Sequence, residues 1–326
     1  MCINDKSNLP KTVNGFFTYL RIIKKSSENT IQGYASDITL YFRYMKKTKL
    51  ELDIEFDDID ISDVDVPFIK SIELTDMYDF MEYLTIDREN GENARSRKIS
   101  SIKSFYTYLQ NKAKLITSNE NPTLELEKPK IEKRSPITMT LDQAKSLIDA
   151  VEEGWYDSKR DKAIIVLLLN CCLRREEVSK LNIDSLYWMT EELEIIGKGN
   201  KQRWLSINNS VNKVLTEWLA DRAERKITIG DENALFLSKQ GNRISKEAVG
   251  EIVKKYVTKA GMDATRFTTH KLRSTGITLM YKNGTTLLAL QKIAGHENIT
   301  TTTIYVEADA KEISNAINSS PLNCLC

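Results

Sequence analysis

Apolar residues recur at the spacing of amphipathic helices through the first third of the chain. Two stripes follow one another, at Val13, Phe16, Phe17, Leu20 and Ile23 and then at Ile31, Tyr34, Ile38, Tyr41, Phe42 and Met45. Further stripes predict helices over about 74–87 and 93–112. A helix with one apolar face buries that face against another element. The first third is therefore predicted to be a helical domain.

The pattern changes once in the second half, between residues 193 and 207. Two β-prone runs flank a turn at Gly197–Lys201, which predicts a hairpin. Elsewhere Thr140 and Gln143 have the offset of a capping box, and the apolar run Ala163–Cys172 is typical of a buried helix. Further helices are expected over about 211–225, 246–260, 270–282, 286–294 and 311–317. The fold class that follows is mainly α, with a small β-hairpin in the second half.

Length and proline placement divide the chain. At about 100–200 residues per domain, 326 residues suggest two domains. Pro122, Pro129 and Pro136 fall in one stretch that also carries lysines and an arginine. Proline interrupts helices and stiffens an extended path. We therefore expect a first domain at 1–118, a linker at 119–136 and a second domain at 137–326.

Composition argues against a membrane protein and against a disulfide scaffold. The longest apolar run, Ala163–Leu169, is far shorter than the roughly 20 residues of a membrane span, and residues 1–11 lack the apolar region of a secretory signal. We therefore expect no membrane partner and a cytoplasmic location. The five cysteines form no CxxC pair, so neither a disulfide framework nor a zinc site is expected.

Charge is segregated along the chain, although the net charge is only +1. Glu51–Asp76 holds ten acidic residues and one lysine, so the remainder of the chain carries +10. That remainder could hold a phosphate backbone, and the acidic stretch would face away from it or simply form a solvated connection between helices. Four cations on the predicted helix over 93–112 either contact DNA or form a solvated face: Arg95, Arg97, Lys98 and Lys103.

Candidate chemistry lies in the second half of the chain, which holds both of its histidines. His270 and Arg273 are three residues apart in an expected helix and therefore share a face, and Arg174 and Glu177 have the same offset. The second histidine follows a glycine and precedes a tyrosine by nine residues. Arginines can bind a phosphate, imidazoles can move protons, and a phenol can act as a nucleophile.

These residues resemble the boxes of the tyrosine site-specific recombinases, the phage-integrase superfamily, and within it the compact Xer-type members. The boxes are Leu-Arg-x-x-Glu at Leu173–Glu177, Gly-Lys-Gly-Asn-Lys-x-Arg at Gly197–Arg203, His-x-x-Arg at His270–Arg273, and Gly295-His296 with Tyr305 nine residues later. The resemblance extends over the N-terminal helices, which look like the family's core-binding domain. It implies a SAM-like core-binding domain and an α-rich catalytic domain that together form a C-shaped clamp on duplex DNA.

The resemblance also implies a role for each residue in the boxes. Tyr305 would be the nucleophile that forms a 3′-phosphotyrosyl intermediate, and Lys198 the general acid. The remaining roles are a phosphate clamp (Arg174, Arg273), proton acceptance from tyrosine (His270), donation to a phosphate oxygen (His296), orientation of the site (Glu177) and DNA contacts (Lys201, Arg203). Such a site needs neither metal nor ATP, so no cofactor is expected.

The expected partners are a double-stranded recombination site and further recombinase protomers. Residues from Val306 to Ile317 form a short amphipathic stretch, which the resemblance identifies as a C-terminal exchange helix that docks on a neighbouring protomer in a DNA-bound tetramer. The alternative is that it packs on its own domain. The partner protomers could be identical or a related recombinase. Chromosome-dimer resolution at the nucleoid and integration or excision of a mobile element both stay open.

Two departures from the family pattern concern fine geometry. Cys172 stands where a glycine is usual, and Ser274 stands where many members have histidine.

Two rival functions come from other classes. A type IB topoisomerase would share this chemistry and act alone, and an inactive DNA-binding module would have lost it.

Overall fold

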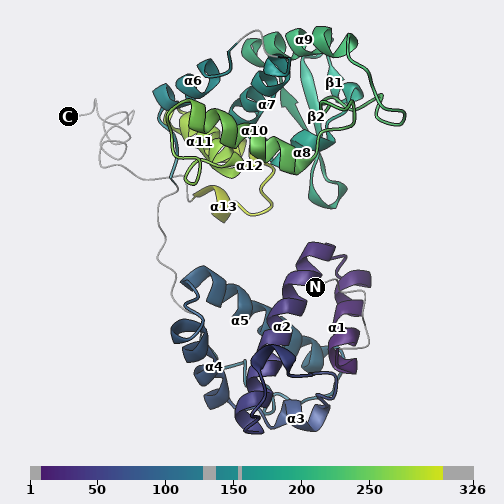
Figure 1. The fold of residues 1–326 in the computed structure, drawn as a ribbon, viewed down its shortest axis with the longest axis vertical. Helices are drawn as coiled ribbons and strands as arrows, with labels where there is room; N and C mark the ends of the chain where they lie inside the picture. Colours follow the sequence, from purple (N-terminus) through teal and green to yellow (C-terminus); the bar gives the residue numbers. More distant parts are fainter. Residues whose placement is uncertain (1–8, 128–136, 153–155, 304–326) are drawn as a thin grey trace, which may run out of the picture. The chain divides into compact units, whose positions relative to one another are not determined.

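The computed structural model describes residues 9–127, 137–152 and 156–303 (Figure 1). The chain divides into two compact units, Met1–Glu132 and Lys133–Cys326. None of the helices in these described ranges combines the length and the apolar character that crossing a membrane requires.

The first unit is a helical bundle built around its longest helix. Its helices are α1 (Lys11–Ile22), α2 (Glu28–Lys49), α3 (Val66–Lys70), α4 (Leu74–Ile86) and α5 (Glu92–Asn111). Helix α2 packs against α1, α4 and α5. The predicted stripes form the core: Phe16, Tyr41 and Tyr106 are fully buried, and the two tyrosine hydroxyls share a hydrogen bond of 2.9 Å. The predicted N-terminal helices are confirmed.

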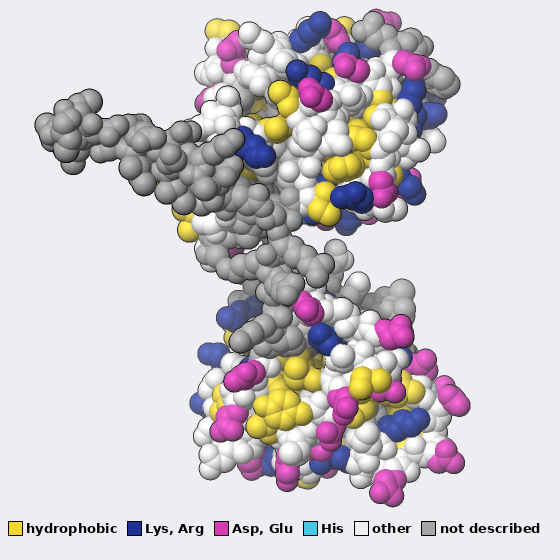
Figure 2. All heavy atoms as spheres, turned by 90° about the vertical axis from the view of Figure 1, so that its left-hand side faces the viewer, with side chains coloured by type: hydrophobic (Ala, Val, Ile, Leu, Met, Phe, Trp, Pro, Cys, Tyr) yellow, Lys and Arg dark blue, Asp and Glu magenta, His cyan; other side chains and the backbone are white. Residues whose placement is uncertain are grey.

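The acidic segment Glu51–Asp76 packs on the first unit through its aliphatic side chains and exposes its acidic ones. Its aliphatic residues Ile61, Val64 and Ile69 are buried in the core of the first unit. Its acidic side chains lie outside, where Asp57 and Asp63 pair with cations of α2 at 3.0 and 2.7 Å. On the face in Figure 2, acidic side chains are spread over this unit. Burial of Ile69 against this core accounts for the short helix α3, which the charge pattern did not indicate.

The expected linker begins with residues that pack on the first unit. Leu126 is buried in its core, and the carbonyl of Leu126 accepts a hydrogen bond of 2.5 Å from Lys103 Nζ. The segment 119–127 is thus part of the packing of this unit, because its apolar residue Leu126 returns to the core. The remainder, 128–136, lies outside the described residues.

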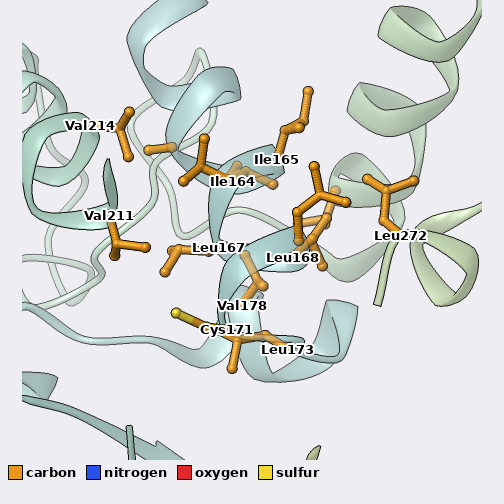
Figure 3. Packing of buried hydrophobic residues seen from close by; sticks show 14 of the residues in the cluster. Ile164, Ile165, Leu167, Leu168, Cys171, Leu173, Val178, Val211, Val214 and Leu272 are labelled. Atoms are coloured by element: carbon orange, nitrogen blue, oxygen red, sulfur yellow. The ribbon is translucent and has the colours of Figure 1, made fainter. Parts of the chain in front are cut away.

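The second unit packs its helices around a central apolar one. The helices are α6 (Leu141–Asp149), α7 (Ser158–Asn170), α8 (Arg175–Lys180), α9 (Asn209–Ala223), α10 (Lys246–Lys259), α11 (Thr269–Lys282), α12 (Leu287–Ala294) and α13 (Thr300–Thr303). Helix α7 is buried, with Val211 and Val214 of α9 on one side and Leu272 of α11 on the other (Figure 3). The capping box of α6 is present at Thr140 and Gln143.

A three-stranded antiparallel sheet, in the order β1-β2-β3, contains the predicted hairpin. Its strands are β1 (Leu186–Tyr187), β2 (Glu192–Ile196) and β3 (Gln202–Ser206), with Ile195 opposite Arg203. The hairpin turns through Lys198–Asn200, where Gly199 and Asn200 have φ of 74° and 61°. The hairpin is confirmed, and β1 is an addition.

A close helix crossing brings the site residues together. A Cβ atom at Gly276 of α11 would lie 2.0 Å from the carbonyl oxygen of Leu169 and 2.8 Å from Cys172 Sγ. Only glycine fits such an approach. The crossing places α11 against the segment that follows α7, and so places Arg273 beside Cys172.

Candidate active site

The C-terminal end of α12 is the point on which the site is assembled. Gly295 ends the helix in the left-handed conformation, with φ of 61°, and the N–H groups of Gly295 and His296 bond to Lys292 and Gln291. Three successive carbonyls then accept from three arginines: Ile293 from Arg203 Nε (3.0 Å), Ala294 from Arg273 Nη2 (2.5 Å) and Gly295 from Arg174 Nη2 (3.2 Å). A helix C-terminus carries partial negative charge, so it favours these cations.

Arg273 is the buried member of the three. Only 1% of the residue is exposed, and its Nη1 donates to the carbonyl of Cys172 at 2.5 Å. Burial first, and then the neighbouring charge of Arg174, lower the pKa of Arg273 to about 10. The guanidinium therefore stays charged at neutral pH and is held by two backbone carbonyls from different parts of the fold.

Cys172 supplies that carbonyl from an unusual backbone conformation. Its φ is 51°, in the left-handed region that favours glycine. The glycine of the family pattern at this position therefore has a physical reason, which the sequence comparison alone did not reveal. Both Cys171 and Cys172 are buried free thiols, and burial raises the pKa of each to about 12.

Glu177 joins two of the arginines. This carboxylate is 5% exposed and accepts from the backbone N–H and Nη1 of Arg174 at 2.9 and 2.8 Å. It also accepts hydrogen bonds from both terminal nitrogens of Arg203, at 3.0 and 2.9 Å. Burial alone would raise the pKa of Glu177, but the hydrogen bonds and charge of Arg203 and Arg174 hold it below its usual value. The carboxylate is thus ionised and fully engaged.

Both histidines lie in this positive field. Burial and the charges of Arg273, Lys271 and Arg174 lower the pKa of His270, near the start of α11. Burial and the arginines Arg273 and Arg174 lower the pKa of His296 to about 4. His296 Nδ1 lies 2.9 Å from the hydroxyl oxygen of the buried Thr302. Both imidazoles are therefore neutral near pH 7 in the absence of a bound anion.

Three further predicted site residues do not join this network in the described part of the structure. Tyr305 lies outside the described residues, as does the expected exchange helix. Lys198 is described by its backbone, which lies at the tip of the hairpin. Lys201 forms an exposed ion pair with Glu297, at 2.5 Å, next to His296.

Arg203 was expected to contact DNA, and the structure gives it other partners. Its side chain is 14% exposed and is bonded to Glu177 and Ile293. The signal that sequence reasoning missed is strand alternation: Arg203 lies two residues before Leu205, whose side chain is buried, so both share the inner face of β3.

The four candidate DNA-contacting cations of α5 each have a partner within the first unit. Arg97 is the exposed one, and its two terminal nitrogens bond the buried Asp37 at 2.5 and 2.7 Å. The other three bond neutral oxygens: Arg95 that of Thr85 (2.6 Å), Lys98 that of Asn90 (2.7 Å) and Lys103 that of Leu126 (2.5 Å). Their contact with DNA stays a prediction.

Comparison with known proteins identifies the family of the chain. The phage integrase family model matches residues 138–312, and the model of the phage integrase N-terminal SAM-like domain matches residues 13–113. A tyrosine recombinase XerC of Caldanaerobacter subterraneus subsp. tengcongensis is 42% identical over 317 residues, covering 96% of this chain and 88% of that protein. A tyrosine recombinase XerD of Oceanobacillus iheyensis is 30% identical over 312 residues, covering 95% and 98%.

The fold is likewise similar to a solved recombinase structure. The Tn1549 transposon integrase in complex with transposon right end DNA has a TM-score of 0.72 at 20% identity, covering 94% of this chain and 98% of that chain. Because the family model matches more than half of the chain and two relatives align along nearly all of it, the chain belongs to the phage integrase family, as a tyrosine recombinase that acts as a DNA strand-transferase.

Proposed function

We propose that the chain cleaves and rejoins duplex DNA at a specific site through a covalent tyrosyl phosphate. The observation that carries the proposal is the anchoring of Arg174 and Arg273 on adjoining carbonyls of α12, with Glu177 and His296 beside them. A preorganised pair of guanidiniums stabilises the charge that develops on the non-bridging oxygens of a phosphodiester.

Arg174 is suited to bind the phosphate. A guanidinium has five N–H donors. Arg174 uses Nη1 on Glu177 and Nη2 on Gly295, and 42% of its side chain is exposed, so donors remain for an anion. Arg273 adds a second positive charge from a buried position.

The neutral histidines suit proton transfer. His270 accepts the proton of the nucleophile, since its lowered pKa leaves it unprotonated near neutrality. His296 donates to a phosphate oxygen through Nε2 when Thr302 donates to Nδ1. A bound phosphate brings negative charge and thereby raises the pKa of His296 again.

The bond changes follow from the family boxes. The Tyr305 oxygen attacks phosphorus and forms a 3′-phosphotyrosyl bond, while the bond from phosphorus to the 5′ oxygen breaks. Lys198 at the hairpin tip supplies the proton to the 5′ oxygen, and the 5′ hydroxyl of a partner strand reverses the step. No oxidant, nucleotide or metal enters this balance.

The wider assembly belongs to the same proposal. Both units contact the duplex, and protomers form a tetramer at the nucleoid in the cytoplasm through the C-terminal exchange helix. The recombinase structure with transposon end DNA supports the DNA partner. Truncation after Asp309 should weaken cooperative occupancy of paired half-sites in gel-shift titrations, and unchanged cooperativity would reject the helix as the coupler.

The test of the reaction uses a nicked duplex selected by the wild-type protein from a random library. Arg174→Lys should slow covalent attachment about 10²–10³-fold, because a point charge cannot replace the guanidinium fork. EDTA should leave the wild-type rate unchanged. Inhibition by EDTA, or an unaffected Lys variant, would contradict the mechanism. Relaxation of a supercoiled plasmid that lacks the site would favour the topoisomerase alternative.

A further inference from the structure

We propose that Arg203 is a positioning residue, which locks the β-hairpin, Glu177 and the C-terminal end of α12 together so that Arg174 and Arg273 meet the phosphate as a preorganised pair. The inference rests on the proposed function and assigns a residue that acts through others, without touching DNA itself.

The geometry of Arg203 leaves it little scope for another role. Its Nε donates to Ile293 at 3.0 Å, and its two terminal nitrogens form a fork on Glu177 at 3.0 and 2.9 Å. With 14% of the side chain exposed, it is turned inward from β3. A planar fork with three fixed donors specifies the relative position of its acceptors.

One acceptor of Arg203, Glu177, also holds the phosphate clamp, and the other, the Ile293 carbonyl, lies next to carbonyls that do. Glu177 also accepts from Arg174, and the carbonyl of Ile293 is followed directly by the two that hold Arg273 and Arg174. Arg203 therefore shares Glu177 with Arg174 and bonds the carbonyl next to the one that holds Arg273. Loss of Arg203 would free Glu177 on one side and the end of α12 on the other.

Gly295 leaves space for this side chain, and Gly197 lies beside it at ordinary van der Waals distance. A Cβ atom at Gly295 would lie 3.0 Å from Arg203 Nη1 and 3.2 Å from its Cζ. A Cβ atom at Gly197 would lie 3.7 Å from Arg203 Nη1 and also 3.7 Å from Glu177 Oε1. The guanidinium thus sits between the two loops that carry Lys198 and His296, which is the place from which both can be positioned.

The charge balance fits a phosphodiester. Arg174, Arg203 and Arg273 with the single carboxylate Glu177 leave two positive charges among these four side chains. A phosphodiester carries one negative charge and gains another as the nucleophile attacks. Arg203 offsets the carboxylate that orients Arg174, so that the clamp keeps its full charge for the substrate.

The experiment compares Arg203→Lys and Arg203→Met with the matched control Arg222→Met. Arg222 is a buried arginine of the same unit that donates to the carbonyls of Ala234 and Glu232, away from the site. Site binding is measured by gel shift, covalent attachment by single turnover on the nicked duplex at saturating protein, and folding by thermal melting. The Lys variant keeps the charge and carries the test if the Met variant does not fold.

A positioning role predicts a selective loss of rate. Both Arg203 variants should bind the duplex as the wild type does and attach about 10²-fold more slowly, the loss expected for misplaced reacting groups. Arg222→Met should melt earlier and attach at the wild-type rate. Weaker binding with an unchanged rate would show a DNA contact, and a rate equal to wild type would show a structural role only. Either result overturns the inference.

A pH profile gives a second readout. In Arg203→Met, Glu177 stays buried beside Arg174 and Arg273 but loses the partner that most lowers its pKa, so its pKa rises. As the pH is lowered from 8 to 5.5, the attachment rate of Arg203→Met should then fall more steeply than that of wild type. Arg203 also lowers the pKa of His296, which therefore rises in the same variant, so the ratio of the two rates reports on Glu177 and His296 together. A constant ratio contradicts the inference, whereas no adduct with wild type would overturn the proposed function as well.

Discussion

Substitution of Gly295 by alanine tests how tightly the site is built around the end of α12. Gly295 has φ of 61°, and a side chain at this position would point at Arg203. The added methyl group would meet Nη1, Cζ and Cδ of Arg203 at 3.0, 3.2 and 3.3 Å. The guanidinium cannot withdraw without lengthening its bonds to Glu177 and Ile293.

Two costs add in this variant. The left-handed backbone costs a non-glycine residue about 1–2 kcal/mol. Overpacking against a bonded side chain costs about 1–3 kcal/mol more. The free energy of unfolding should therefore fall by the sum of these, about 2–5 kcal/mol. Displacement of Arg203 should also slow covalent attachment about 10²-fold.

Gly261→Ala is the matched control. Gly261 has φ of 72°, and nothing lies within 4 Å of its added Cβ atom. It carries the backbone cost without the contact. Urea unfolding and single-turnover attachment are measured for both variants. Equal losses of stability, with both rates at the wild-type value, would refute the claim that Gly295 makes room for Arg203.

Two further predictions concern packing and protonation. Gly276→Ala should lower the free energy of unfolding by about 3 kcal/mol or more, measured by urea unfolding, because its Cβ atom would lie 2.0 Å from a backbone carbonyl; a stable variant would contradict the helix crossing. The pKa of His296 is lowered to about 4 in the folded protein, so between about pH 6.5 and 4 the unfolded state binds more protons and acid destabilises the fold. The melting temperature of wild type should fall more over this range than that of His296→Gln, and parallel curves would exclude the lowered pKa.

The periodic elements of this fold were predictable from sequence alone. Long stripes such as Ile31–Met45 gave helix α2, and the glycine-rich turn gave the hairpin. Helix α8 has six residues and β1 has two, so neither is long enough to show the periodic spacing of apolar residues that identifies a helix or a strand. Leu126 illustrates another limit, since tertiary packing, not local pattern, decides that it returns to the core of the first unit.

The candidate site was predictable as a set of residues but not as a network. Box spacing brought out Arg174, Glu177, Arg273 and His296, which the structure places around one helix end. It could not show that the partners of these arginines are backbone carbonyls, because a carbonyl has no sequence signature. The same limit applies to Arg203, for which a DNA contact was expected, since a cation in a hairpin gives no sign of a buried carboxylate 26 positions away.

The most direct test of the account is the identity of the residue that becomes linked to DNA. The wild-type protein should form a covalent adduct with the nicked duplex, and peptide mapping should find the phosphate on Tyr305. Tyr305→Phe removes one oxygen and should bind the same duplex without forming an adduct. An adduct that persists in the Phe variant, or a phosphate mapped to another residue, would contradict the central claim.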